Sequence, residues 1–307
     1  MVRILFFRDF PPWSPSHYLQ RALESIPDVD VMPVYVDRSS ALFTIPYRLP
    51  SISRFWFNPT FRHAARQYDR VGPFDLVLVG EWLNVPFRVR GLGRKSAYWA
   101  WDTPLGREQG RYRTLDRGYD LILNAQPKES AWLKEDFPSS RVVTFPFGAD
   151  RRLFQPQGET RSVDASFVGV VKAGKRTTFL REAQRLMPTL QVTESFAPPW
   201  GYSRHLRTSR ATLHLSENGE VSIRPFEAVC AGCRLVTDSV TYLKACLGEI
   251  AEEVVTFPDR GREGAKEMAA AAVERARSAT PLPPSVQARA LELHSYDARA
   301  RSLLSMI

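Results

Sequence analysis

A chain of 307 residues with 44% hydrophobic and 24% charged residues has the composition of a folded globular protein, not of a disordered or fibrous one. This length exceeds the usual single hydrophobic core, so we expect two domains, and no apolar run approaches the about 18 residues of a membrane span. The net charge is +9, and more of the excess positive charge lies in the first half of the chain. This charge favours an anionic partner.

The three cysteines indicate a reducing compartment. Cys230, Cys233 and Cys246 form no even set for disulfide pairing, and the Cys-x-x-Cys pair has no second pair or nearby histidine for zinc. The chain begins directly with a strand-like run and shows no signal peptide. We therefore predict a cytoplasmic protein without a transmembrane segment or a bound metal.

The first half alternates strand-like and helix-like segments. A buried strand at 3–7, a helix after Ser14 or Ser16 and a strand at 29–36 make a Rossmann-like opening. This opening lacks Gly-x-Gly-x-x-Gly, which argues against NAD or FAD. Two later strands end on Glu81 and Asp102, and carboxylates at the end of parallel strands point into the ligand crevice.

Residues 45–70 interrupt this alternation. The stretch interleaves aromatic residues with arginines, among them Arg54, Phe55, Trp56 and Arg62. Such a pattern stacks bases and holds phosphates, or forms a packed cover along which arginine stems lie. It also suits a lipid-linked acceptor at a membrane surface, so the sequence leaves these alternatives open.

The second half begins a new sheet after a linker at 155–163. A strand ends on Gly169, and a basic cluster of Lys172, Lys175 and Arg176 precedes a helix. Glycine lets a ligand approach the backbone, and cations at a helix start suit a diphosphate. A further strand is followed by a loop containing Glu194, which we predict to hold a nucleotide base.

We predict the ligand site at a strand-turn-helix unit formed by the residues at 211–238. A strand at 211–215 runs into a polar turn containing Asn218 and Glu220; Ser222 is expected to cap a helix that Gly232 ends. Arg224 at the helix start adds a positive charge for a diphosphate, and Glu227 is placed to accept two ribose hydroxyls. The strand, turn and helix predict a nucleotide-diphosphate-sugar site.

These residues resemble a known family. Glu227-Ala228-x-x-x-Gly232 is similar to the nucleotide-sugar motif of retaining glycosyltransferases with the GT-B fold, and Arg-x-Phe-Glu is similar to their CgeB-like, spore maturation type branch. Pro146–Asp150 and the terminal His294-x-Tyr296-x-x-Arg299 resemble the same branch. One position departs from the retaining pattern, because Gly219 stands where those families carry an acidic residue.

The resemblance implies two Rossmann-like domains that face a central cleft. We expect an acceptor-side domain at 1–155, a nucleotide-sugar domain at 156–292 and a C-terminal helix at 293–307 that packs back on the first domain. Asp9 and His17 are then expected on the acceptor side. Donor contacts are expected from the set Gly169, Lys172, Lys175, Arg176, Glu194, Asn218, Glu220, Ser222 and Glu227.

The predicted function is metal-independent transfer of a sugar, a hexose, from a nucleotide-diphosphate sugar such as a UDP-sugar to an acceptor hydroxyl. Arg224 is expected to neutralise the leaving diphosphate, and Asp102 or Glu81 is the candidate general base if the reaction inverts the anomeric centre. The alternatives are glycosylation of hydroxylated bases in DNA and a catalytically inactive protein that binds nucleotide-sugars or nucleic acid. The acceptor (a saccharide, protein, lipid-linked group or modified DNA base) and the oligomeric state stay open.

Overall fold

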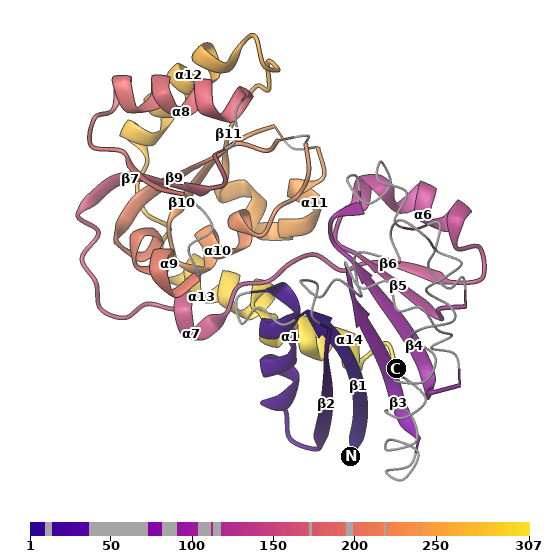
Figure 1. The fold of residues 1–307 in the computed structure, drawn as a ribbon. Helices are drawn as coiled ribbons and strands as arrows, with labels where there is room; N and C mark the ends of the chain where they lie inside the picture. The colour runs from indigo at the N-terminus through magenta and orange to yellow at the C-terminus, as the bar shows by residue number, and fades with distance from the viewer. Residues whose placement is uncertain are drawn as a thin grey trace. The chain divides into compact units, whose positions relative to one another are not determined.

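The chain folds into two compact units, each built on one parallel sheet. The computed structural model describes residues 1–9, 14–36, 73–81, 91–103, 112, 118–171, 174–194, 199–217, 219–239 and 241–307 (Figure 1). The first unit comprises Met1–Pro146 and Ala300–Ile307, and the second comprises Phe147–Arg299. The prediction of two Rossmann-like α/β sheets is confirmed. The functional domain boundaries at 155 and 292 stay predictions.

The first unit contains a six-stranded sheet in the order β2-β1-β3-β4-β5-β6, in which every neighbouring pair is parallel. The strands are β1 (Val2–Asp9), β2 (Val29–Val36), β3 (Phe74–Gly80), β4 (Gly93–Ala100), β5 (Leu121–Asn124) and β6 (Arg141–Thr144). After β1 the chain forms β2 on one side of β1, and β3 and the later strands lie on the other side of β1. The order of strands therefore reverses between β1 and β3, which is where α/β sheets of this type bind ligands.

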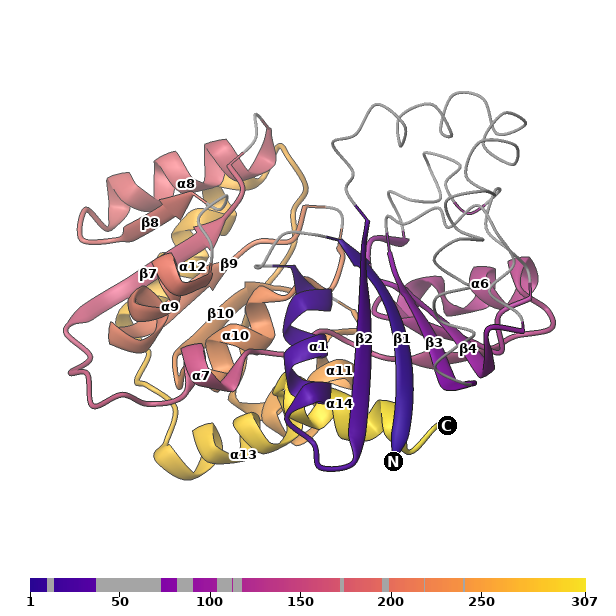
Figure 2. The ribbon, with the colours of Figure 1, turned by 60° about the horizontal axis from the view of Figure 1, so that its bottom comes forward.

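Helices and the end of the chain complete the first unit. They are α1 (Pro15–Glu24), the 3₁₀ turn η2 (Pro127–Glu129), α6 (Ser130–Asp136) and the end of α14 (Tyr296–Leu304). Figure 2 shows α1 along β2 and β1; the Ser14 hydroxyl caps α1 by accepting from the backbone N–H of His17 at 3.3 Å. Lys95 Nζ donates to the carbonyl of Met306 at 2.9 Å, which ties the last residues to β4.

The second unit contains a five-stranded parallel sheet in the order β11-β10-β9-β7-β8. The strands are β7 (Val163–Gly169), β8 (Gln191–Glu194), β9 (Ser209–His214), β10 (Arg234–Asp238) and β11 (Val255–Phe257). The chain passes from β7 to β8 on one side and then returns to β9 on the other. The order of this sheet therefore reverses between β7 and β9.

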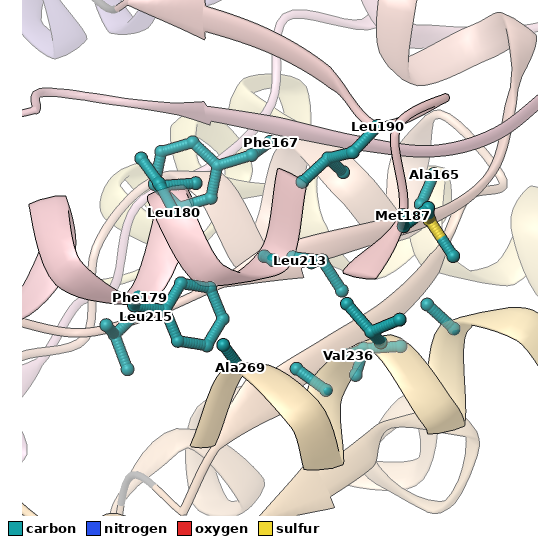
Figure 3. Packing of buried hydrophobic residues seen from close by; sticks show 14 of the residues in the cluster. Ala165, Phe167, Phe179, Leu180, Met187, Leu190, Leu213, Leu215, Val236 and Ala269 are labelled. Atoms are coloured by element: carbon teal, nitrogen blue, oxygen red, sulfur yellow. The ribbon is translucent and has the colours of Figure 1, made fainter. Parts of the chain in front are cut away.

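The helices of the second unit cover both faces of its sheet. They are α7 (Arg151–Phe154), α8 (Lys175–Leu186), α9 (Pro199–Thr208), α10 (Arg224–Cys230), α11 (Leu243–Leu247), the 3₁₀ segment η3 (Gly248–Glu253), α12 (Ala265–Ser278) and α13 (Pro284–His294). Figure 3 shows apolar side chains of α8 and α12, among them Phe179 and Ala269, packed with Phe167, Leu213 and Val236 of the strands. This buried cluster contributes to the hydrophobic stabilisation of the unit.

Gly232 ends α10 as the sequence predicts. Its φ of +74° lies in the left-handed region, and the backbone N–H of Cys233 reaches back to the carbonyl of Ala228 at 3.0 Å. A Cβ at this position would lie 2.5 Å from the side chains of Arg161 and Gln287. Glycine is therefore required by the backbone conformation, and a larger residue would also displace the ends of these two side chains.

Two segments far apart in the sequence pair with each other in the second unit. Ala149 forms a parallel bridge with Ser295, and Arg299 Nε donates to the carbonyl of Phe147 at 3.0 Å. A Cβ on Gly148 would lie 2.9 Å from the backbone nitrogen of Tyr296, which leaves room only for glycine. The Gly-Ala-Asp segment and the His-x-Tyr-x-x-Arg tail thus form one structural element.

Candidate functional site

The carboxyl ends of β7 and β9 are brought together by Arg176 of α8. Its two terminal nitrogens donate to the carbonyls of Val170, at 2.8 Å, and Leu215, at 2.6 Å, and its Nε lies 3.5 Å from the Glu217 carboxylate. These two carbonyls belong to the loops after β7 and after β9. Arg176 lies at the predicted edge of the sheet, where it holds the two loops together at the point of reversal.

Lys175 and the glycines around it occupy the same edge. Gly169 is the last residue of β7, and Gly174 precedes α8 with a φ of +136°, a conformation that L side chains rarely adopt. Lys175 begins the helix, and its Nζ lies 3.4 Å from the carboxylate of Asp259 after β11. The predicted basic cluster therefore contributes two cations to this edge, each with a carboxylate partner.

The predicted pair Arg224 and Glu227 is joined by Tyr202 of α9 in one buried cluster. Arg224 donates to Glu227 Oε2 and to the Tyr202 hydroxyl, which itself donates to Glu227 Oε1 at 2.9 Å. The guanidinium also lies over the Tyr202 ring, 4.3 Å from its centroid. The side chain of Glu227 is 1% exposed and that of Arg224 is 20% exposed, so Arg224 forms the accessible side of the cluster.

Burial and the attraction between Arg224 and Glu227 have opposite effects on the pKa of Arg224. Burial alone lowers the pKa of Arg224, but Glu227 and Tyr202 outweigh it and hold that pKa above its ordinary value. Arg224 therefore stays charged at every physiological pH. A charged arginine at the edge of the sheet retains planar donors that suit a phosphate or a carboxylate.

Ser222 does not cap α10, which corrects the sequence prediction. The residue before the first helical turn is Ile223, whose side chain makes no capping hydrogen bond. The Ser222 hydroxyl instead bonds to Nε2 of His214 at 2.9 Å, while Nδ1 of the same ring bonds to the Thr237 hydroxyl at 2.9 Å. Burial lowers the pKa of His214 to about 3, and the neighbouring Arg176 acts in the same direction, so the imidazole is neutral.

The turn between β9 and α10 is closed by Glu220. Its carboxylate accepts from the backbone N–H of Glu217 at 3.0 Å, and Gly219 has a φ of +73°. Gly219 therefore gives the turn its left-handed backbone at the position where the retaining families carry an acidic residue.

Four of the predicted donor and acceptor contacts involve groups that the structure does not describe. They are the residues Lys172 and Asn218 and the side chains of Glu194 and Asp9.

In the first unit, Glu81 organises the segment that carries Asp102. One oxygen of its carboxylate accepts from the backbone N–H groups of Trp101 and Asp102, and the other accepts from the Tyr112 hydroxyl. Glu81 is 1% exposed, and burial raises its pKa to about 7 against the effect of these bonds. Asp102 itself is half-buried, two residues after the end of β4. The two predicted carboxylates are therefore brought together, with Glu81 beneath Asp102.

The removal of Glu81 is expected to destabilise the first unit. In Glu81→Ala, two backbone N–H groups and one buried hydroxyl lose their acceptor, and each such group costs about 1–3 kcal/mol. We expect the free energy of unfolding to fall by about 3 kcal/mol or more in a denaturant titration, whereas Glu81→Gln, which keeps an acceptor oxygen, loses much less. Equal stability of the alanine variant and the parent would contradict the structural role of this carboxylate.

His17 lies on α1, one turn from its N-terminus. Its ring packs edge-on against Tyr18 with 5.6 Å between centroids, and the residue is half-buried. Tyr202, His214 and Asp238 were not among the predicted site residues. The position of His214 at the end of the predicted strand was the available signal, because polar side chains at strand ends face the ligand edge.

Among the residues that the structure describes, no helix combines the length and hydrophobicity needed to cross a membrane. The same residues contain no group of three or more His, Cys, Asp or Glu side chains arranged to hold a metal ion. The three cysteines are buried and form no disulfide bond with one another.

Comparison with known proteins shows the GT-B fold. Residues 153–305 match the family model described as glycosyl transferase-like, and no curated protein matches the chain. Sucrose-phosphate synthase from Thermosynechococcus elongatus has a TM-score of 0.69 at 13% identity, over 100% of this chain and 98% of that chain. Anabaena HepE in complex with UDP and glucose has a TM-score of 0.65 at 11% identity, over 100% and 99%. A glycosyltransferase from Rickettsia africae has a TM-score of 0.60 at 8% identity, over 99% and 97%.

Proposed function

We propose that this protein is a glycosyltransferase that moves a hexose from a UDP-sugar to an acceptor hydroxyl without a bound metal ion. One observation carries the proposal: the segment that matches the glycosyl transferase-like model, 153–305, includes the buried cluster of Tyr202, Arg224 and Glu227. The GT-B fold agrees with this function, and the Anabaena structure of the same fold contains UDP and glucose. The CgeB-like branch and a cytoplasmic location are part of the same proposal.

The proposed donor site lies at the carboxyl edge of the second sheet. The charged Arg224, together with Lys175 and Arg176, supplies positive potential where a diphosphate carries about two or more negative charges. Lys172, Asn218, Glu220 and Glu194, the last residue of β8, are proposed as further donor contacts. In this role Arg224 stabilises the leaving diphosphate, as an electrostatic donor does at other transferase sites.

Glu227 is proposed to act from beneath Arg224. Both of its oxygens are engaged, one by Tyr202 and the other by Arg224. The Glu227 carboxylate therefore fixes the orientation of the Arg224 guanidinium. It binds ribose hydroxyls only when they replace Tyr202 or Arg224 as the donor. Either action makes nucleotide affinity depend on the carboxylate.

The Glu227→Gln variant tests this dependence. The amide keeps the size of the side chain but removes the charge that aligns Arg224, so we expect about a tenfold loss of UDP affinity in titration calorimetry. Glu253→Gln is the matched control, because Glu253 pairs with Arg234 in the same unit, outside the proposed site. Unchanged UDP affinity in Glu227→Gln, with a folded protein, would remove Glu227 from the donor site.

On the acceptor side, Asp102 is proposed as the general base and Glu81 as the residue that positions it. Both oxygens of Glu81 already accept hydrogen bonds, and the residue is buried, so it presents no site for an acceptor hydroxyl. Asp102 is half-buried at the end of its strand. Asp9 ends β1, the neighbour of β3 in the sheet, and His17 lies on α1, which follows β1; both are proposed as acceptor contacts.

A further inference from the structure

The hydroxyl of Ser222 ends a chain of buried polar side chains at the carboxyl ends of β9 and β10. His214 is 6% exposed, Thr237 is 0% exposed and Asp238 is 1% exposed. The contacts run from Ser222 Oγ to His214 Nε2, from His214 Nδ1 to Thr237 Oγ1, and from Thr237 Oγ1 to Asp238 Oδ1 at 3.2 Å. We call these four side chains the serine relay.

The donor and the acceptor of each hydrogen bond in the serine relay can be assigned by starting from Asp238, the buried end of the relay. A carboxylate only accepts, and Asp238 receives the backbone N–H and the hydroxyl of Ser216. Thr237 must therefore donate its one hydroxyl proton to Asp238, so its oxygen accepts from His214 Nδ1. Since the ring is neutral, Nε2 then carries no proton and accepts from Ser222.

This direction fixes what Ser222 offers to a ligand. The only hydroxyl proton of Ser222 is used toward His214, so its oxygen can only accept further hydrogen bonds. A phosphate oxygen is also an acceptor, and two acceptors facing each other repel. A sugar or ribose hydroxyl, in contrast, brings a proton of its own.

We propose that the serine relay holds Ser222 as a hydrogen-bond acceptor that selects a hydroxyl of the nucleotide-sugar and does not bind its diphosphate. The inference rests on the proposed function, because it assigns a role to one residue of the proposed donor site. His214, Thr237 and Asp238 are positioning residues in this scheme. Ser222 is the residue that touches the ligand.

The first measurement reads the tautomer directly and needs no ligand. The full-length protein is labelled with ¹⁵N histidine, and the His214 signal is assigned by its loss in His214→Gln. We expect long-range ¹H–¹⁵N correlations at neutral pH to show a protonated Nδ1 and an unprotonated Nε2. A protonated Nε2, in either the other tautomer or a charged ring, would overturn the inference.

The second measurement compares the affinities of three probes, namely UDP-glucose, UDP and inorganic pyrophosphate, for the parent and Ser222→Ala. Loss of one neutral hydrogen bond corresponds to roughly a 2- to 12-fold weaker affinity. We expect this loss for UDP-glucose and none for pyrophosphate. A matching loss for UDP assigns the contact to a ribose hydroxyl, and an unchanged UDP affinity assigns it to the sugar. A loss for pyrophosphate, or no loss for any probe, would overturn the inference.

The third measurement separates the relay from general packing. Thr237→Val removes the hydroxyl in the middle of the relay, and we expect it to weaken UDP-glucose binding about as much as Ser222→Ala and to allow a protonated Nε2. Thr237→Ser restores the hydroxyl and is expected to restore both properties. The control is Thr212→Val, the same change at a buried threonine of β9 whose hydroxyl donates to the carbonyl of Ser166 at 3.1 Å.

The outcomes distinguish this inference from the proposed function. If the parent binds none of the three probes, the proposed function fails, and the tautomer of His214 still decides whether the relay has the inferred direction. If the parent binds UDP-glucose but Thr237→Val leaves both the tautomer and the affinity unchanged, the relay inference fails alone.

Discussion

Arg224→Ala is expected to lose on the order of 100-fold or more in turnover, measured as UDP released from UDP-glucose. The guanidinium is the accessible charge of the Tyr202–Arg224–Glu227 cluster, and the loss of one donor to a developing negative charge costs about that much in other enzymes. Arg224→Lys keeps the charge but not the planar pair of donors, so its turnover should lie between the two.

Arg224→Ala is also expected to be less stable than the parent. For an arginine that only lines a cleft, the same substitution would leave the stability nearly unchanged. Glu227 is 1% exposed, and without Arg224 its charge is buried and unpaired. Breaking such a pair by removing one partner costs about 3–5 kcal/mol. The double variant Arg224→Met with Glu227→Gln removes both charges and separates the two effects. We expect stability to return toward that of the parent while turnover stays low; recovery of turnover would show that Arg224 is only a structural partner.

Asp102→Asn is expected to lower the same turnover by about 10²- to 10⁴-fold, the range that a general base contributes. UDP affinity should stay at the parent value, because Asp102 belongs to the first unit and the proposed donor site belongs to the second. Glu81→Gln should keep most of the turnover, since an amide oxygen still accepts from the backbone N–H groups that fix Asp102.

Asp30→Asn serves as the control for this change, because Asp30 is an exposed carboxylate on β2. Full turnover in Asp102→Asn would exclude Asp102 as the base. A loss in Glu81→Gln as large as that in Asp102→Asn would instead assign the base to Glu81.

The sequence predicted the parts of the fold that depend on local pattern. Buried strands, amphipathic helices and the glycine that ends α10 follow from hydrophobic spacing and backbone conformation, which a single sequence displays. Strand-end residues such as Glu81 and Asp102 were identified for the same reason, because parallel strands present their carboxyl ends at one edge.

The partners of the site residues could not be predicted in this way. Ser222 has the sequence context of a helix cap, but His214 of β9 takes its hydroxyl. Arg176 has the context of a phosphate ligand, but it donates to two loop carbonyls. In both cases the choice depends on distances across the sheet, which sequence spacing does not contain. Tyr202 was missed because a tyrosine in a helix carries no local sign of a buried ion pair.

Titration calorimetry of the full-length protein with UDP tests the central claim most directly. The account predicts saturable binding with one site per chain, weaker in Arg224→Lys and in Glu227→Gln, and unchanged in Glu253→Gln. The absence of binding for UDP, and also for ADP, GDP and CDP, would contradict a nucleotide-sugar donor site, as would UDP binding that is insensitive to both Arg224 and Glu227.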